Sequence, residues 1–388
     1  MSITGKKLLY ISEVPVELSY AGATLMYRLL EEYPKHDLLI VQTGMPTTGR
    51  KLEGVRYVQF GEKRIRFMNR IANYKAGVRL KIIAKQQIGP SLAKEIRLFR
   101  PDAVISVTFN LSWLTALVIS KKYSIPLHLV LHDDFLSTED YGRAQPYLER
   151  KFKEAYLHAS GRYCISPQME AYYNEAYGMK GSVIYPARGK NDIAYAVDWA
   201  TRRDKTSLNY CYAGSMGTSD FLPMTDMIAD MLGKAGHRLI IFSKIPDQLL
   251  ARYKHLTLPH VSVRPMVHPD ELKKYLSEEA DVNILLNSFE QEKLFRLNFS
   301  SKIVDYTAVD LPVLFWGAQT SGIGAWLASG KYPAMIDRPG HHPVEEEIRR
   351  MDSAAYRKDL ADHLQRMARD TFSHERNYGI FTDQLKMH

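Results

Sequence analysis

Short apolar segments alternate with helix-like segments along the chain, and this alternation limits the fold more than any other feature. In the first half, strand-like runs lie at residues 7–11, 38–41, 103–107, 127–131, 162–165 and 183–185. Strands that alternate with helices are typical of a parallel sheet covered by helices on both faces. The first half is therefore predicted to be a doubly wound α/β domain.

The same alternation begins again after a polar stretch at residues 187–207. We place a domain boundary there and predict two Rossmann-like domains, residues 1–187 and 208–370. Strand-like runs of the second domain lie at residues 208–213, 239–242, 261–263, 282–286 and 311–315. Ligands of such sheets bind beyond the carboxyl ends of the strands, so we expect a site in the cleft where the two domains face each other.

The cysteines and the amino terminus favour a cytoplasmic protein. Cys164 and Cys211 both lie in apolar strand-like runs, which indicates two buried, reduced thiols. The apolar run before Ser12 is too short for the core of a signal peptide. Residues 103–120 carry no charge, but their pattern of strand, turn and helix argues against a membrane span.

The net charge of +9 is concentrated in one segment. Residues 61–100 hold 11 Lys or Arg and only two acids, Glu62 and Glu95. A patch of this kind attracts phosphate groups, on an anionic membrane or on nucleic acid. Apolar residues interleave with the bases, as in helices that lie in a membrane interface; they are Ile65, Phe67, Met68, Ile71, Leu80, Ile82 and Ile83. We therefore predict a peripheral position on the inner face of the membrane; a solvated helical face is the alternative.

Three loops that follow predicted strands carry candidate functional residues. The loop after the first strand enters a helix at Gly22, where free backbone N–H groups could hold a phosphate or the reacting end of a substrate. His132 ends a buried strand at its carboxyl edge. The Asp133–Asp134 pair that follows is not interpreted as a metal site, because adjacent acids on an extended chain point apart. Gly214 and Ser215 follow the first strand of the second domain, where glycine allows a diphosphate to approach closely.

The strongest signal lies at residues 299–313. Ser300 and Ser301 suit the N-cap of a helix. Lys302 would then occupy the first helical turn, where a cation is favourable only if an anion shares the site. Asp305 lies one turn further on the same face. A lysine for a diphosphate and a carboxylate for ribose hydroxyls together predict a nucleotide site; the alternative is a plain helix with an exposed Lys/Asp pair.

These segments together resemble the GT-B glycosyltransferases, most closely glycosyltransferase family 4. The resemblance covers nearly the whole chain. The sequences Arg-Pro-Asp-Ala-Val-Ile at residues 100–105 and Ser-Ile-Pro-Leu-His-Leu-Val-Leu-His-Asp at 124–133 are similar to two strands of the family. Ser-Lys-Ile-Val-Asp-Tyr-Thr-Ala at 301–308 and Leu-Pro-Val at 311–313 are similar to its donor-binding motif.

The resemblance implies a role for each candidate. His132 would lie near the donor sugar and Gly22 near the transferred group. Met266 and Val267 would lie near the base, with Lys302 and Asp305 at the diphosphate and ribose. It also implies transfer with retention and without a bound metal or cofactor, and a last helix, at 371–388, that crosses back onto the first domain.

The sequence departs from the family pattern at two places. The family has an Arg and a Lys after the glycine that corresponds to Gly214; here Lys302, Arg296 or Lys244 could replace them. The family also has two glutamates eight residues apart. Asp305 fits the second, but Leu297 stands at the first, so Glu290 or Glu292 could serve instead.

The function expected from this resemblance is transfer of a hexose in polysaccharide biosynthesis. The donor would be UDP- or GDP-linked, and the acceptor a glycan or a lipid-linked sugar. Two alternatives share the fold: a UDP-sugar epimerase and a non-catalytic subunit that binds a sugar nucleotide. Nucleic-acid binding is not expected, because the basic segment matches no known module.

Overall fold

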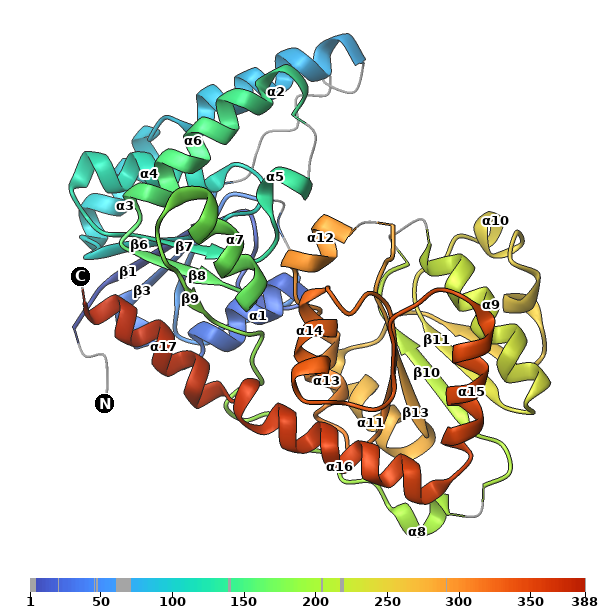
Figure 1. Cartoon of the computed structure of the whole chain (residues 1–388). Coiled ribbons are helices and arrows are strands. Elements are labelled where there is room, and N and C mark those ends of the chain that lie inside the picture. Colours follow the sequence, from blue (N-terminus) through green and yellow to red (C-terminus); the bar gives the residue numbers. More distant parts are fainter. Residues whose placement is uncertain are drawn as a thin grey trace. The chain divides into compact units, whose positions relative to one another are not determined.

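The structure of the protein is a computed structural model that describes residues 5–19, 21–44, 46, 48–60, 71–138, 141–203, 205–216, 220–290 and 292–387. The chain forms two compact units, Met1–Lys190 with His374–His388, and Asn191–Ser373 (Figure 1). The predicted domains are residues 1–187 and 208–370, whereas the units meet between residues 190 and 191 and between residues 373 and 374. Residues 191–207, expected to be a linker, belong to the second unit.

The first unit is built on a parallel sheet with the strand order β5-β3-β1-β6-β7-β8-β9. Its inner strands are apolar and fully buried, which matches the continuous apolar runs that identify them in the sequence. A short antiparallel pair, β2 (Glu17–Leu18) and β4 (Arg50–Lys51), lies beside it. The strands of the sheet are β1 (Leu8–Ser12), β3 (Leu38–Gln42), β5 (Arg56–Gln59), β6 (Ala103–Val107), β7 (Leu127–Leu131), β8 (Gly161–Cys164) and β9 (Ser182–Val183).

Helices cover this sheet, and the largest side chains of its core are aromatic. Trp113 packs edge-on against Phe135 and Phe152, with ring centroids 5.2 and 5.5 Å away. Residues 103–120 form strand β6 and most of helix α4, as the sequence predicts. The helices are α1 (Ala21–Leu30), α2 (Ile71–Lys85), α3 (Pro90–Phe99), α4 (Ser112–Tyr123), α5 (Phe135–Thr138), α6 (Gln145–His158), α7 (Pro167–Tyr177) and α17 (His374–Lys386).

Helix α17 comes from the end of the chain but belongs to the first unit. It contacts α1 and β8. The Tyr163 hydroxyl donates to the carbonyl oxygen of Phe381 at 3.1 Å, and the Asn377 side chain accepts from the backbone N–H of Tyr185 at 2.9 Å. The side chains of Phe381 and Leu385 on this helix are buried, so the helix contributes to the core of the first unit.

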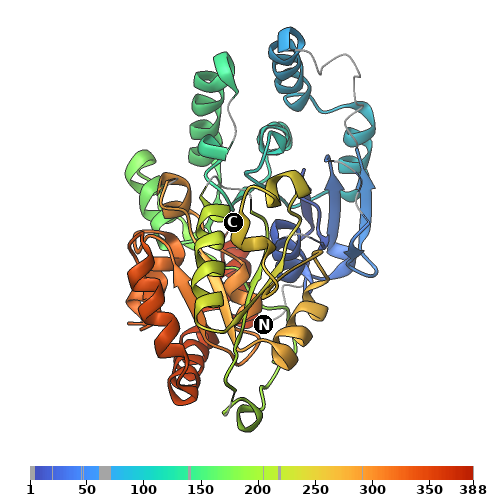
Figure 2. The same ribbon diagram turned by 90° about the vertical axis from the view of Figure 1, so that its right-hand side faces the viewer.

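The second unit repeats the doubly wound plan with the strand order β12-β11-β10-β13-β14-β15, and helices flank its sheet on both sides (Figure 2). All paired strands of this sheet are parallel. Its strands are β10 (Asn209–Ala213), β11 (Arg238–Phe242), β12 (Val261–Arg264), β13 (Val282–Leu286), β14 (Val313–Trp316) and β15 (Met335–Ile336). Its helices are α8 (Trp199–Arg202), α9 (Phe221–Lys234), α10 (Asp247–Leu250), α11 (Pro269–Glu279), α12 (Glu292–Leu297), α13 (Lys302–Tyr306), α14 (Gly322–Ser329), α15 (His341–Met351) and α16 (Ala354–Thr371).

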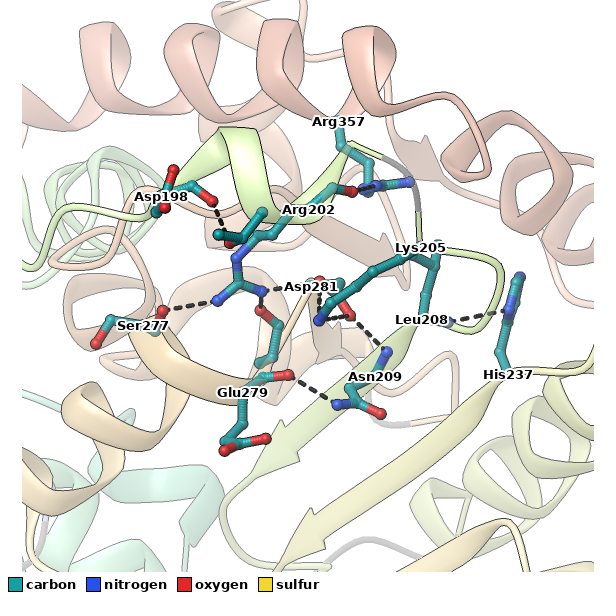
Figure 3. Close-up of polar contacts among 12 residues, drawn as sticks. Asp198, Arg202, Lys205, Leu208, Asn209, His237, Ser277, Glu279, Asp281 and Arg357 are labelled. Carbon is teal, nitrogen blue, oxygen red and sulfur yellow. Dashed lines mark hydrogen bonds and ion pairs between the residues drawn. The ribbon is translucent and has the colours of Figure 1, made fainter.

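A buried ionic network fixes residues 198–209 to the amino-terminal end of this sheet (Figure 3). The guanidinium of Arg202 donates to the carboxylate of Asp281 at 2.8 Å and to the carbonyl oxygen of Ser277 at 2.6 Å. Lys205 Nζ lies 3.0 Å from the same carboxylate, which also accepts from the backbone N–H of Asn209. Arg202 and Lys205, which lie in the polar stretch expected to be a linker, therefore form ion pairs with Asp281 inside the second unit.

Candidate functional site

The predicted donor-binding residues all lie at one edge of the second sheet. Gly214 and Ser215 follow β10, Lys244 follows β11, and Met266 and Val267 follow β12. Glu290 follows β13, and the helix α13 follows the same strand further along the chain. Because these strands are parallel neighbours, their carboxyl ends meet at one edge, where ligands of doubly wound sheets bind.

Gly214 and Lys302 lie against each other. A Cβ atom added at Gly214 would come within 2.1 Å of Lys302 Cε and 2.6 Å of its Nζ. The backbone φ angle of Gly214 is +140°, a conformation that other residues rarely adopt. Glycine is therefore required here twice, once for the backbone turn and once for the approach of the lysine.

Two tyrosines hold this lysine and the turn. Lys302 Nζ donates to the Tyr212 hydroxyl at 2.8 Å and lies 4.5 Å from the centre of the Tyr212 ring. The Tyr212 hydroxyl in turn donates to the carbonyl oxygen of Ser215 at 2.8 Å. From α13, the Tyr306 hydroxyl accepts from the backbone N–H of Ala213 at 2.8 Å. Neither tyrosine is among the site residues predicted from the sequence.

The ammonium group of Lys302 has no carboxylate within ion-pair distance in the described part of the chain, although it is half-buried. Desolvation lowers its pKa to about 8. A cation that is desolvated without a counter-charge gains stability from an incoming anion. Lys302 thus has the position and the electrostatics of a phosphate ligand, beside a glycine that lets its side chain approach the turn after β10.

The helix that carries Lys302 differs from the prediction. It spans Lys302–Tyr306, shorter than expected, and the side chain of Ser301 makes no capping hydrogen bond. The backbone of Ser301 is already helical, which moves its hydroxyl away from the N–H groups that an N-cap accepts from. Asp305 is half-buried within this helix. Ser301 therefore occupies the predicted N-cap position without making the capping hydrogen bond, and Lys302 begins the helix as predicted.

The remaining donor candidates are open to solvent. Lys244 and Glu290 are exposed, and Val267 is half-buried. Met266 is 60% exposed, an unusual state for a large apolar side chain. Its place beyond β12 leaves its surface available to stack on a planar group.

Asp220 joins two loops at the same edge, and sequence reasoning missed it. Its Oδ2 accepts from the Ser288 hydroxyl at 2.8 Å and from the backbone N–H of Phe289 at 2.9 Å. The side chain is buried, which for a carboxylate requires such partners. Asp220 therefore fixes the loop that carries Glu290, close to the turn that begins at Gly214. The intervening Gly217 lies outside the described residues.

In the first unit, the structure brings Gly22 and His132 together. A Cβ atom at Gly22 would lie 3.2 Å from His132 Cε1, so the helix α1 approaches the imidazole through its glycine. His132 follows β7 and its side chain is 16% exposed. Both residues lie at the carboxyl edge of the first sheet, as the sequence predicts.

The two acids after His132 have separate environments. The Asp133 carboxylate lies 3.6 Å from His132 Nδ1; burial raises the pKa of Asp133, but the hydrogen bond and charge of His132 outweigh it and lower the pKa. Asp134 is fully buried and accepts from the hydroxyls of Tyr173, at 2.6 Å, and Ser137. Among the described residues, no group of three or more His, Cys, Asp and Glu could hold a metal.

The basic segment is only partly described. Residues 61–70 lie outside the described residues, as do the side chains of 71–76. On α2, the described helix carries no acid, and Leu80 and Ile83 are 56% and 54% exposed beside exposed Arg79 and Lys81. On α3, Leu98 is exposed beside Arg97. In the described part of the chain, no helix is both long and apolar enough to cross a membrane.

Comparison with solved structures defines the class of fold. The trehalose-phosphate synthase (UDP-forming) of Burkholderia vietnamiensis matches with a TM-score of 0.68 and 11% identity over 99% of this chain and 100% of that one. The Anabaena protein HepE, solved with UDP and glucose, matches with a TM-score of 0.67 and 13% identity over 98% and 100%. The Burkholderia xenovorans synthase, solved with glucose-6-phosphate, matches with a TM-score of 0.69 and 10% identity over 97% and 100%. The chain has the GT-B fold of these glycosyltransferases.

The family comparison narrows this class. Residues 79–187 match the family model described as Glycosyltransferase Family 4, so the resemblance identified in the sequence is confirmed. The matched segment begins within α2, ends shortly after β9 and includes His132. Among curated proteins, no sequence matches the chain. The second unit, which carries the candidate donor residues, lies outside the segment matched by the family model. Its similarity to known proteins is the similarity of fold described above.

Proposed function

We propose that the protein transfers a hexose from a UDP-linked donor to a glycan or lipid-linked acceptor, with retention and without a metal or cofactor. The observation that carries this proposal is the contact of Lys302 with Gly214 at the carboxyl edge of the second sheet. A desolvated ammonium group without a carboxylate partner among the described residues suits a diphosphate. The HepE structure, which contains UDP and glucose, supports UDP as the nucleotide.

In this proposal the residues of the second unit hold the donor. Lys302 neutralises the diphosphate, and most strongly when the departing UDP gains charge in the transition state. Asp305 and Glu290 accept hydrogen bonds from ribose and sugar hydroxyls, Met266 and Val267 contact the base, and Ser215 and Lys244 lie beside the phosphates. In the first unit, His132 and Gly22 lie near the transferred sugar.

The first test measures UDP binding by calorimetry. Hydrogen bonds to charged groups contribute roughly 1.5–3 kcal/mol, so Lys302→Ala is expected to weaken UDP binding by about tenfold or more. Lys274→Ala, which removes an exposed lysine of α11 in the same unit, is the control. Equal affinity of the Lys302→Ala variant and the native protein would remove the centre of the proposal.

The second test separates the transferase from its alternatives. A transferase releases free UDP from a UDP-sugar in proportion to transfer, an epimerase converts the sugar nucleotide without release, and a non-catalytic subunit binds it unchanged. Screening UDP- and GDP-linked sugars by thermal shift, followed by detection of free nucleotide, distinguishes these three outcomes.

We further propose that the protein binds the membrane through α2, where it would meet a lipid-linked acceptor. The exposed Leu80 and Ile83 on α2, flanked by Arg79 and Lys81, form a surface that suits the interface of an anionic membrane. Each basic residue near such a surface contributes about 1 kcal/mol. A lipid-linked acceptor on the inner face of the membrane would then be within reach.

Vesicle co-sedimentation tests this surface. We expect binding to vesicles of phosphatidylglycerol and phosphatidylcholine, loss of binding in 1 M salt, where the Debye length is about 3 Å, and loss with the double change Leu80→Gln and Ile83→Gln. Leu157→Gln, an exposed leucine on α6 of the same unit, is the control. No sedimentation with anionic vesicles at low salt would favour a soluble acceptor.

A further inference from the structure

A second group of polar side chains lies at the carboxyl edge of the first sheet, where β3, β1 and β6 are neighbours. Glu13 follows β1, Thr43 follows β3, and Ser112 begins α4 after β6. The fourth member, Lys85, is the last residue of α2. We call these residues the Glu13 cluster. Glu13 lies in the candidate loop that leads to Gly22. None of the four is among the predicted donor-binding residues.

The contacts in this cluster converge on one oxygen of Glu13. Lys85 Nζ lies 2.7 Å from Glu13 Oε1, and the Ser112 hydroxyl donates to the same oxygen at 3.1 Å. Thr43 Oγ1 lies 2.6 Å from Ser112 Oγ, and Lys85 Nζ also donates to both hydroxyls at 3.3 Å. The carboxylate is therefore held in one orientation by residues from three different elements.

The other oxygen, Glu13 Oε2, has no hydrogen bond or ion pair with any described residue. The side chain as a whole is 11% exposed, as is that of Lys85. Glu13 thus presents one fixed acceptor oxygen from an otherwise enclosed ion pair.

Stability alone is a weak reason for this arrangement. A buried ion pair gives up hydration that its mutual attraction only partly recovers, and apolar residues of similar size commonly stabilise a fold as well. The position, in contrast, is that of a ligand site. Glu13 is followed by Val14, whose Cγ1 lies 3.7 Å from the Cβ position of Gly22, and Gly22 in turn contacts His132. Glu13 therefore belongs to the same loop as Val14, which packs against Gly22 beside His132.

We propose that Glu13 binds the sugar acceptor, with Oε2 accepting a hydrogen bond from an acceptor hydroxyl. Lys85, Ser112 and Thr43 are positioning residues that orient the carboxylate through Oε1. Because Glu13 and Lys85 neutralise each other, the cluster selects hydroxyl groups rather than phosphate. This inference rests on the proposed function and adds a substrate class to it: an acceptor recognised through the hydroxyls of a neutral sugar ring.

The test measures sugar binding by saturation-transfer NMR in the presence of UDP, with D-glucose and glucose 6-phosphate as probes. Loss of a hydrogen bond to a charged group is expected to weaken the binding of both sugars in Glu13→Gln by about tenfold. Because the cluster recognises hydroxyls, the two sugars are expected to lose affinity equally. Binding of UDP, measured in parallel, is expected to change less than twofold.

Ser112→Ala is the milder variant, because it removes one hydrogen bond to Oε1 and keeps the ion pair. It is expected to weaken sugar binding less than Glu13→Gln does. Glu154→Gln, which removes a surface carboxylate of α6 paired with Lys121 and Lys151, is the matched control with native affinity for both sugars. Melting temperatures of all variants separate loss of folding from loss of binding.

Three outcomes would overturn the inference. Neither sugar binds the native protein, the Glu13→Gln variant binds both sugars as tightly as the native protein, or sugar and UDP affinities fall together. Failure of the proposed function has a different signature, which is native sugar binding that depends on Glu13 with no release of UDP from any UDP-sugar.

Discussion

Lys302 combines two properties that the sequence shows only in part. Its place at the start of a helix after β13 is readable from the residues at 299–313. Its environment is not, because Tyr212, Gly214 and Phe221 come from β10, the turn after it and the start of α9, about 80 to 90 positions earlier. The i,i+3 and i,i+4 relations connect only residues within one or two turns of the same helix. They cannot predict contacts between different loops at the edge of the sheet.

The lowered pKa of Lys302 predicts a pH dependence of UDP binding. In the free protein the pKa is about 8, and a bound diphosphate raises it because the charged form gains an anion. Above pH 8, binding therefore takes up a proton, and affinity is expected to fall by roughly tenfold per pH unit until the pKa of the complex is reached. Below pH 7 the affinity is expected to be constant with respect to this group.

Calorimetry at pH 7, 8, 9 and 10 measures this dependence, and Lys302→Met supplies the control. That variant should bind UDP weakly, with no fall in affinity between pH 8 and 10. The same fall in both proteins would assign the titration to another group.

Gly214 supports a second prediction at the residue scale. Gly214→Ala places a methyl group where Lys302 Cε now lies and forces alanine to a φ of +140°. Strain of this kind costs of order 1–3 kcal/mol. We expect a lower melting temperature and loss of at least about tenfold in UDP affinity, equal to the loss in Lys302→Ala.

Gly236→Ala isolates the effect of strain in that experiment. Gly236 has a φ of +77°, but nothing lies within 4 Å of its Cβ position. It should lower the melting temperature and leave UDP affinity unchanged. A Gly214→Ala variant that melts early but binds UDP normally would show that Lys302 does not need this approach.

At the scale of elements, the predictable parts are those with strong local patterns. The inner strands of both sheets follow from uninterrupted apolar runs. Strands β4 and β5 were missed because their residues are exposed or half-buried and show no apolar run. Helix α17 could be assigned to the first unit only through the family resemblance, since no local pattern reports a partner nearly 200 residues away.

The residues of the candidate site also include some that the sequence could predict and some that it could not. Gly214, Lys302, Gly22 and His132 were predictable because each follows a strand, and carboxyl ends of parallel strands meet at one edge. Asp220, Tyr306 and the Glu13 cluster were not, because their roles depend on which loops become neighbours. A sequence pattern identifies the edge of a sheet more readily than the contacts across it.

The network around Asp281 predicts a large effect on the stability of the second unit. Asp281 is fully buried, and Asp281→Asn would leave the guanidinium of Arg202 buried without its counter-charge. Breaking a buried ion pair from one side costs about 3–5 kcal/mol. Urea unfolding is expected to show a loss of this size, whereas Asp247→Asn, on the exposed start of α10, should show none. A loss below about 1 kcal/mol would mean that water replaces the carboxylate.

At the scale of the whole molecule, the chain passes between its units twice, after Lys190 and before His374. Both crossings are held by the same two carboxylates at the end of α1. The backbone N–H of Lys190 donates to Glu31 and its ammonium group pairs with Glu32. His374 Nε2 lies 2.8 Å from Glu32 Oε2, and its Nδ1 lies 3.7 Å from Glu31 Oε1.

This arrangement predicts that Glu32 stiffens both crossings in a pH-dependent way. Burial raises the pKa of Glu32, but the hydrogen bonds from Lys190 and His374 outweigh it and hold the pKa below its ordinary value. The stabilisation of the folded protein by Glu32 is therefore present above the pKa of glutamate in the unfolded chain, about 4.3. It is lost as the pH falls through the lower pKa of Glu32 in the folded protein. The pair with His374 is partly exposed, so its expected contribution is at most about 1 kcal/mol.

Hydrogen exchange measured at pH 7 tests this prediction. In Glu32→Gln, the amides at residues 188–192 and 373–376 are expected to exchange faster together, while those of β1 and β10 keep their native rates. Glu278→Gln, on the exposed face of α11, is the control. As the pH falls through the lowered pKa of Glu32, the native protein should approach the exchange pattern of the variant. Faster exchange at only one of the two crossings would contradict a shared clamp, because Glu31 and Glu32 contact Lys190 and His374 alike.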